Sequence, residues 1–86
     1  MTIYPLGLIS IANGVENATT LGNATHIYVV EKNNAEAIIT ITDGEGTTKA
    51  SFGLAGKDAL TFRKESTDKI YSNTENTHFT KIGYAN

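Results

Sequence analysis

The sequence has no cysteine and no tryptophan, and it has one proline among its 86 residues. Without cysteine, disulfide scaffolds, zinc fingers and thiol catalysis are all excluded. The two histidines, His26 and His78, are far apart in sequence, so we expect no metal centre and no other cofactor. A domain this small is often stabilised by disulfides or a metal. We therefore expect this chain to be stabilised by oligomerisation or by docking on a larger partner.

Positive charge is scarce and scattered. The seven Lys and Arg residues form no cluster and the formal net charge is −2, which disfavours binding to nucleic acid. The longest apolar stretch near the N-terminus, residues 6–12, is much shorter than a membrane span and follows no basic residue. We expect neither a signal peptide nor a membrane anchor.

Catalytic motifs are also missing. The segment Gly44–Lys49 has glycines and a lysine but not the spacing of a phosphate-binding loop, and no serine lies in a Gly-x-Ser-x-Gly elbow. No carboxylate is expected to be buried where its pKa would shift. These patterns predict a protein that is not an enzyme.

Short apolar-polar alternations separated by turn residues are what the sequence does contain. Asp43–Gly46 and Ala55–Asp58 have the composition of tight turns, and no segment predicts a helix of three turns. The predicted strands are 25–31, 37–42, 47–54, 59–64, 69–72 and 77–84. This spacing predicts an all-β fold, a small antiparallel β-sandwich or barrel of about six to seven short strands with an extended N-terminal arm. Successive hairpins predict a meander.

The alternation also predicts which side chains face the core. Residues 25–31 are apolar on both faces, which indicates a central strand or a strand with one face in an interface. Thr40 and Thr42 are expected to face water, whereas Leu60 and Phe62 are expected to face the core.

The first 24 residues differ from the rest. One short apolar segment, Leu8–Ile11, precedes an Asn-Gly turn and a polar run, so we interpret residues 1–24 as an arm and loop and residues 25–86 as the β-domain. Tyrosines on a surface either bind a partner or cap the edge of the core, and both readings are open here. The candidate partner-binding residues are Leu6, Leu8, Ile9 and Ile11 in the arm and Tyr28, Tyr71 and Tyr84 in the domain.

Residues 23–86 resemble the small β-rich virion proteins of tailed bacteriophages, many of them from marine and cyanobacterial hosts. The matching features are an Ile-Thr-Ile strand at 39–41, a Gly-Thr-Thr turn at 46–48, Ser51-Phe52-x-Leu54, Arg63-Lys64 followed by Thr67-Asp68-x-Ile70, and a closing Tyr84. The chain departs from this pattern at Gly53, where the pattern has threonine, and in the extra charges Glu31 and Lys32.

The resemblance implies a non-enzymatic virion protein, made in the host cytoplasm and seated on the capsid surface. The implied role is that of a capsid decoration (cement) protein that binds the major capsid protein and contacts copies of itself as a dimer or trimer. Two alternatives are open. One is a tail, neck or other virion subunit, and the other is a carbohydrate-binding or adhesin module that uses the tyrosines as a stacking platform.

Overall fold

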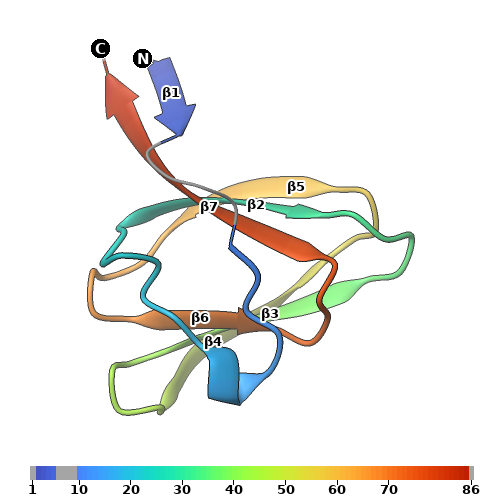
Figure 1. The fold of residues 1–86 in the computed structure, drawn as a ribbon, viewed down its shortest axis with the longest axis horizontal. Helices are drawn as coiled ribbons and strands as arrows, with labels where there is room; N and C mark the ends of the chain where they lie inside the picture. The colour runs from blue at the N-terminus through green and yellow to red at the C-terminus, as the bar shows by residue number, and fades with distance from the viewer. Residues whose placement is uncertain (1, 6–9, 86) are drawn as a thin grey trace.

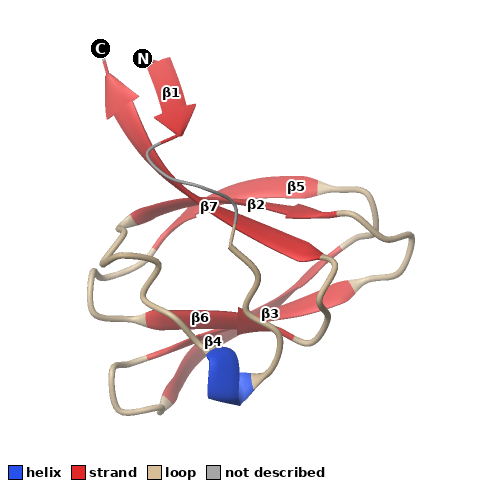
Figure 2. Ribbon diagram, in the orientation of Figure 1, coloured by secondary structure: helices blue, strands red, loops and turns tan. Residues whose placement is uncertain are grey.

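Seven short strands make up the described part of the fold, which we take from a computed structural model (Figure 1). The structure describes the backbone of residues 2–5 and 10–85 and the side chains of residues 10–83. The strands are β1 (Thr2–Pro5), β2 (His26–Glu31), β3 (Ala37–Thr42), β4 (Thr48–Leu54), β5 (Ala59–Arg63), β6 (Lys69–Ser72) and β7 (Thr77–Ala85). The helix among the described residues is the single 3-10 turn η1 (Val15–Asn17), drawn in blue in Figure 2.

The strands form two antiparallel sheets that face each other. One sheet has the order β1-β7-β2-β5 and the other the order β4-β3-β6. This arrangement confirms the predicted all-β sandwich, and β2 has the central position that its two apolar faces indicated. The predicted meander is wrong, because β5 pairs with β2 rather than with β4. The turn at 55–58 carries the chain across to the opposite sheet (Figure 1).

A compact apolar core fills the space between the sheets. Ile27, Val29, Ile39, Ile70 and Phe79 are fully buried, and they come from four strands of the two sheets. Successive residues of a strand point to opposite faces, so one residue in two reaches this core. The alternation visible in the sequence therefore specifies the buried face of most strands.

Two of the predicted faces need correction. Thr40 and Thr42 were expected to face water but are buried, and the Thr40 hydroxyl lies 2.9 Å from that of Ser51 on the neighbouring strand. Strand β3 is the middle strand of its sheet, so side chains of β4 and β6 flank both threonines, whereas Ile38 on the same face stays partly exposed. Leu60 does face inward, opposite the buried Val29, but it is 42% exposed because β5 is an edge strand.

The N-terminal segment packs against the body from Ser10 onward. Ser10 forms a bridge to Phe79, and Thr19 forms one to Ile70 at the outer edge of β6. Three apolar residues of the segment belong to the core cluster, namely Ala12, Leu21 and Ala24. The later part of the expected arm therefore contributes to the same core as the strands.

Both ends of the chain meet in a two-stranded ribbon. Strand β1 pairs with the last residues of β7, from Thr2 opposite Ala85 to Pro5 opposite Ile82. The first half of β7 pairs with β2 in the body of the sheet. Figure 1 shows the ribbon extending beyond the two sheets, with the N- and C-termini side by side.

Candidate functional site

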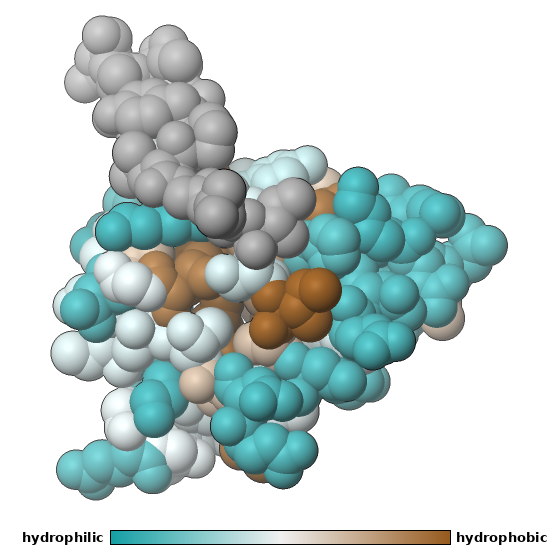
Figure 3. All heavy atoms as spheres, in the orientation of Figure 1, coloured by the Kyte–Doolittle hydropathy of each residue, from teal (hydrophilic) through white to brown (hydrophobic). Residues whose placement is uncertain are grey.

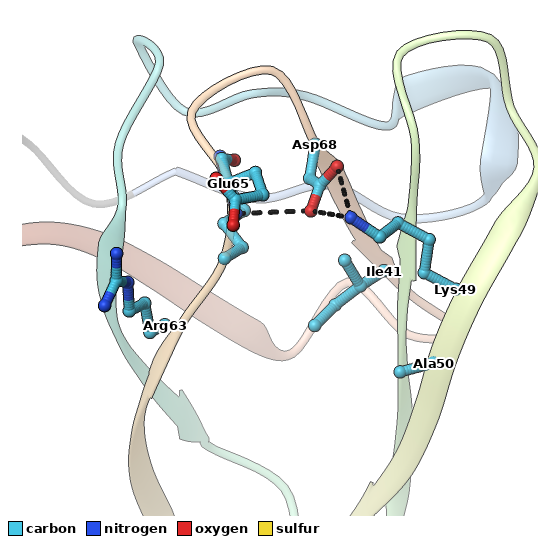
Figure 4. A pocket seen from close by; sticks show the side chains of 7 residues that line it. Ile41, Lys49, Ala50, Arg63, Glu65 and Asp68 are labelled. Atoms are coloured by element: carbon cyan, nitrogen blue, oxygen red, sulfur yellow. Dashed lines mark hydrogen bonds and ion pairs between the residues drawn. The ribbon is translucent and has the colours of Figure 1, made fainter.

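An open pocket of about 540 Å³ lies at one end of the sandwich, beside the β3–β4 and β5–β6 turns (Figure 4). Ile41 and Ala50 supply its apolar surface. The remaining lining residues are charged, namely Lys49, Arg63, Lys64, Glu65 and Asp68. They come from segments that are distant in sequence, so the pocket exists only in the folded chain.

A β-bulge aims Lys49 at this pocket. The register of β3 and β4 shifts where Ile41 pairs with Ala50 and Thr42 pairs with Thr48, which leaves Lys49 as the extra residue. A bulge bends the strand locally and redirects the side chain of the extra residue. The Lys49 Nζ donates to both carboxylate oxygens of Asp68, at 2.9 and 3.1 Å (Figure 4).

This ion pair changes the proton affinity of both partners. Asp68 is almost fully buried, and the hydrogen bond from Lys49 lowers the pKa of its carboxyl in spite of the opposing effect of burial. The same hydrogen bond raises the pKa of Lys49. Asp68 also accepts from the backbone N–H of Glu65, at 3.2 Å, and so closes the turn that precedes β6.

Lys64 is the second buried charge at this end. Its Nζ donates to the backbone carbonyls of Ala24, at 2.6 Å, and Glu65, at 3.2 Å. Burial lowers the pKa of Lys64, and the nearby Asp68 partly offsets that shift. Lys64 thereby ties the end of the N-terminal segment to the β5–β6 turn.

The pocket thus combines an apolar surface with charges that are held in place by one another and by the backbone. Arg63 extends away from the Lys49–Asp68 pair (Figure 4). The described lining contains no hydroxyl, thiol or imidazole side chain. The arrangement closes one end of the sandwich, and it presents mixed charge to solvent.

A second buried polar cluster lies between β2, β6 and β7. The Thr77 hydroxyl donates to Glu31 Oε1 at 2.6 Å and lies 2.9 Å from the Ser72 hydroxyl. The other Glu31 oxygen accepts from the backbone N–H of Asn33 at 3.1 Å. The expectation that no carboxylate is buried with a shifted pKa is wrong for Asp68, and Glu31 is also fully buried. Their partners are remote in sequence, so no local signal reveals them.

The candidate residues of the N-terminal segment are partly described. Leu6, Leu8 and Ile9 lie outside the described residues. Ile11 is 54% exposed, and Val15, four residues further on, is 61% exposed. Val15 was not among the candidates from the sequence, since nothing local separates it from the polar loop around it.

Two of the candidate tyrosines, Tyr28 and Tyr71, lie on different sheets. Tyr28 lies between the buried Ile27 and Val29, so it points outward from its sheet, and it is 40% exposed. Tyr71 is half-buried in β6 of the other sheet. The backbone of Tyr84 pairs with Ile3 in the ribbon, and its side chain lies outside the described part.

The two histidines lie on the same sheet but at a distance. His78 is opposite Val30, which is four residues along β2 from His26, so about 13 Å of strand separates them. Within the described chain no group of three or more His, Asp or Glu side chains is placed to hold a metal ion.

The chain was compared with protein families, curated proteins and solved structures. No protein-family model, curated protein or solved structure matches this chain. In the described part of the chain, no helix has the length and apolar character needed to cross a membrane. Any functional assignment therefore rests on the sequence resemblance and on the surfaces that the fold exposes.

Proposed function

We propose that this protein is a non-enzymatic virion structural protein, a capsid decoration (cement) protein of a tailed phage that binds the major capsid protein and stabilises the head. The observation that carries the proposal is the projecting ribbon of β1 and β7 (Figure 1). The resemblance of residues 23–86 to phage virion proteins supports it independently of the fold.

The ribbon has the properties of an attachment element. A two-stranded ribbon alone is marginally stable in water, and a partner that covers its faces or edges stabilises it. Since β7 continues into the central part of the sheet, a load on the ribbon is transmitted directly to the body.

Exposed apolar residues also occur in the N-terminal segment, in and shortly before η1. Ile11 and Val15 are both more than half exposed. Figure 3 shows apolar side chains exposed near the middle of one face, surrounded by hydrophilic ones. Exposed apolar groups with a polar surround are typical of protein–protein contacts. We assign the ribbon and these two residues to contact with the capsid lattice.

Binding to capsids tests the proposal. Purified protein is incubated with expanded capsids of the phage that encodes it, and co-sedimentation and the melting temperature of the capsids are measured. We expect saturable binding and a higher capsid melting temperature. The double variant Ile11→Ser/Val15→Ser is expected to bind more weakly, whereas Ile38→Ser, at an exposed apolar residue of β3, is the matched control. A protein that leaves capsids unbound and unstabilised contradicts the proposal.

Position in the virion separates a decoration protein from a tail or neck subunit. A decoration protein occupies the many repeated sites of the capsid lattice and is present in many copies per particle. A tail or neck subunit occupies a single ring and is present in few copies. Quantitative mass spectrometry of whole particles measures the ratio of this protein to the major capsid protein. A ratio near that of a single ring assigns the protein to the tail or neck.

Tyr28 favours carbohydrate binding as a second candidate function. Its exposed ring lies on the outer face of the sheet, with Thr61 on one side and Thr80 on the other. An aromatic face flanked by hydroxyl groups suits stacking on a sugar ring. A glycan array with the wild type and Tyr28→Ala tests this function, which predicts saturable binding that the substitution abolishes. An array without signal excludes it for the glycans tested.

A further inference from the structure

Strand β5 forms an edge of the four-stranded sheet. Two hydrogen bonds show which of its residues direct their backbone N–H and C=O groups toward β2. The Lys64 N–H donates to the Thr25 carbonyl and the Glu31 N–H to the Asp58 carbonyl, both at 2.9 Å. Along an antiparallel strand, the backbone N–H and C=O groups of successive residues point alternately toward the paired strand and away from it. The outward-facing backbone groups of β5 therefore belong to Ala59, Thr61 and Arg63.

The inward-facing side chains of β5 are incompletely covered. Leu60 is opposite the buried Val29 and is nevertheless 42% exposed. Phe62 packs edge-to-face on Phe52 of β4, with ring centroids 5.5 Å apart, and is half-buried. Another strand placed beside β5 would cover both side chains, because it would continue the inner layer of the sandwich.

The two ends of β5 carry opposite charges, with Asp58 just before the strand and Arg63 at its last position. The Asp58 carboxylate lies at the outer edge, where it accepts from the Ala59 N–H at 2.8 Å. Arg63, at the other end, is exposed. An antiparallel copy of β5 centred on Thr61 places Arg63 of each copy opposite Ala59 of the other, next to Asp58. Opposite charges then meet twice, and no like charges face each other.

We propose that two copies of this chain associate through their β5 edges, antiparallel about a two-fold axis at Thr61. Thr61 then pairs with Thr61 of the second copy, and Leu60 of each copy packs beside Phe62 of the other. The contact adds about four backbone hydrogen bonds and joins the two four-stranded sheets into one. This dimer proposal does not depend on the proposed role in the virion.

The free edge of the other sheet is less suited to this pairing. Strand β4 has the bulge at Lys49 near its start, which interrupts the regular ladder. Bulges and lysines are devices by which edge strands avoid pairing. Strand β5 pairs with β2 in unbroken register over its whole length.

A single cysteine tests the register, because the chain has no other cysteine. In the proposed dimer the two Thr61 Cα atoms are about 5.5 Å apart, within the range that a disulfide spans. Thr61→Cys is therefore expected to form a covalent dimer on mild oxidation. Ala59→Cys is the matched control, since it lies about 13 Å from its counterpart and is expected to stay largely uncrosslinked.

The oligomeric state of the unmodified protein is measured by light scattering and analytical ultracentrifugation. We expect a dimer in the micromolar range. A wild type that is monomeric at several hundred micromolar overturns the proposal. Equal crosslinking of Thr61→Cys and Ala59→Cys also overturns it. So does a wild type that dimerises while Thr61→Cys forms no disulfide-linked dimer.

Proline substitutions give a second measurement that needs no oxidation. Thr61→Pro removes an outward N–H of β5, and Ser51→Pro removes one of β4 while leaving β5 intact. We expect Thr61→Pro to raise the dimer Kd by about tenfold or more and Ser51→Pro to leave it unchanged. Circular dichroism checks that both variants fold. The reverse order of effects assigns the interface to β4. If Thr61→Pro does not fold, Leu60→Glu takes its place, and an unchanged Kd for that variant contradicts the β5 interface.

Discussion

Individual charges at the pocket give the protein a dependence on pH. The pKa of Asp68 is lowered by Lys49, so the stability from this carboxylate is fully present above its ordinary value of 3.8. It is lost as the pH falls through the lower folded value. The pKa of Lys49 is raised above its ordinary value of 10.5. The stability that its ammonium group contributes is therefore fully present below pH 10.5 and is lost as the pH rises through the pKa of the folded state.

Asp68→Asn tests this dependence. The substitution removes the ion pair, so we expect a lower melting temperature than that of the wild type at pH 7 and a difference that shrinks below about pH 4. Thermal unfolding between pH 2 and 8 measures it. Glu45→Gln, in the exposed β3–β4 turn, is the control and is expected to leave the pH profile unchanged. The same difference at pH 2 and pH 7 would contradict the assignment.

Thr77 is predicted to stabilise the fold through the buried Glu31. Thr77→Val keeps the shape of the side chain but leaves a buried carboxyl oxygen without its 2.6 Å donor. We expect a loss of about 1–3 kcal/mol in the free energy of unfolding, measured with urea. Thr80→Val, half-buried on the opposite face of the same strand, is expected to change it by less than about 0.5 kcal/mol. Equal effects of the two substitutions would exclude the role given to the Thr77 hydroxyl.

Among the elements, the central strands and the edge strands differ in how much of the core they hold. Phe79 of β7 is fully buried, whereas Phe62 of the edge strand β5 is half-buried. Phe79→Ala is expected to cost about 3–5 kcal/mol, and Phe62→Ala less than about 2 kcal/mol in the monomer. Denaturant unfolding of both variants measures the ranking. A larger cost at Phe62 would mean that the edge strands carry more of the core than their burial indicates.

The turns that lead into β3 and β5 are packed against each other at the end of the sandwich. The Lys57 N–H donates to the Asn33 carbonyl at 2.9 Å, and a Cβ at Gly56 would overlap the backbone of Asn34. Gly56→Ala is therefore expected to lower stability by about 2 kcal/mol or more, since backbone must move. Gly44→Ala meets only ordinary van der Waals contact and is expected to be mild. Differential scanning calorimetry compares the two, and similar melting temperatures would contradict the close packing of these turns.

For the whole molecule, the two parts of the N-terminal segment are predicted to have different roles. Deleting residues 1–5 removes β1 and leaves in place every core residue that the structure describes, so we expect the melting temperature to fall by no more than about 5 °C. Deleting residues 1–24 removes Ala12, Leu21 and Ala24 from the core, and we expect that chain to be unfolded at 25 °C. Circular dichroism measures both. A folded chain after the longer deletion would show that residues 10–24 are an accessory arm.

The same shorter deletion connects stability to the proposed function. If the ribbon is the attachment element, the chain without residues 1–5 stays folded and loses capsid binding, because β7 has lost its partner strand. Dimerisation through β5 is expected to persist in this variant, since β5 lies at the opposite edge of the sheet. The two proposed interfaces are therefore separable in one protein.

Local patterns in the sequence were enough to predict strands β2 to β7, whereas β1 lies in the segment interpreted as an arm. Alternating apolar residues and glycine-rich turns are short-range signals, and the predicted segments 37–42 and 69–72 agree with β3 and β6 in both bounds. The exposure of Tyr28 follows from the same alternation, because the residue lies between Ile27 and Val29. These properties depend on neighbours one or two positions away.

The pairing of strands and the buried polar groups depended on the tertiary structure. Alternation shows that β4 and β5 each have an apolar face, but it does not show that they lie in different sheets. Glu31 meets Thr77 across 46 positions, and Lys49 meets Asp68 across 19. Burial of a carboxylate is tolerated only where a donor is brought to it. The sequence by itself therefore determined strands β2 to β7. Only the tertiary structure decided the pocket, the sheet edges and the polar core, because folding alone brings these donors to their acceptors.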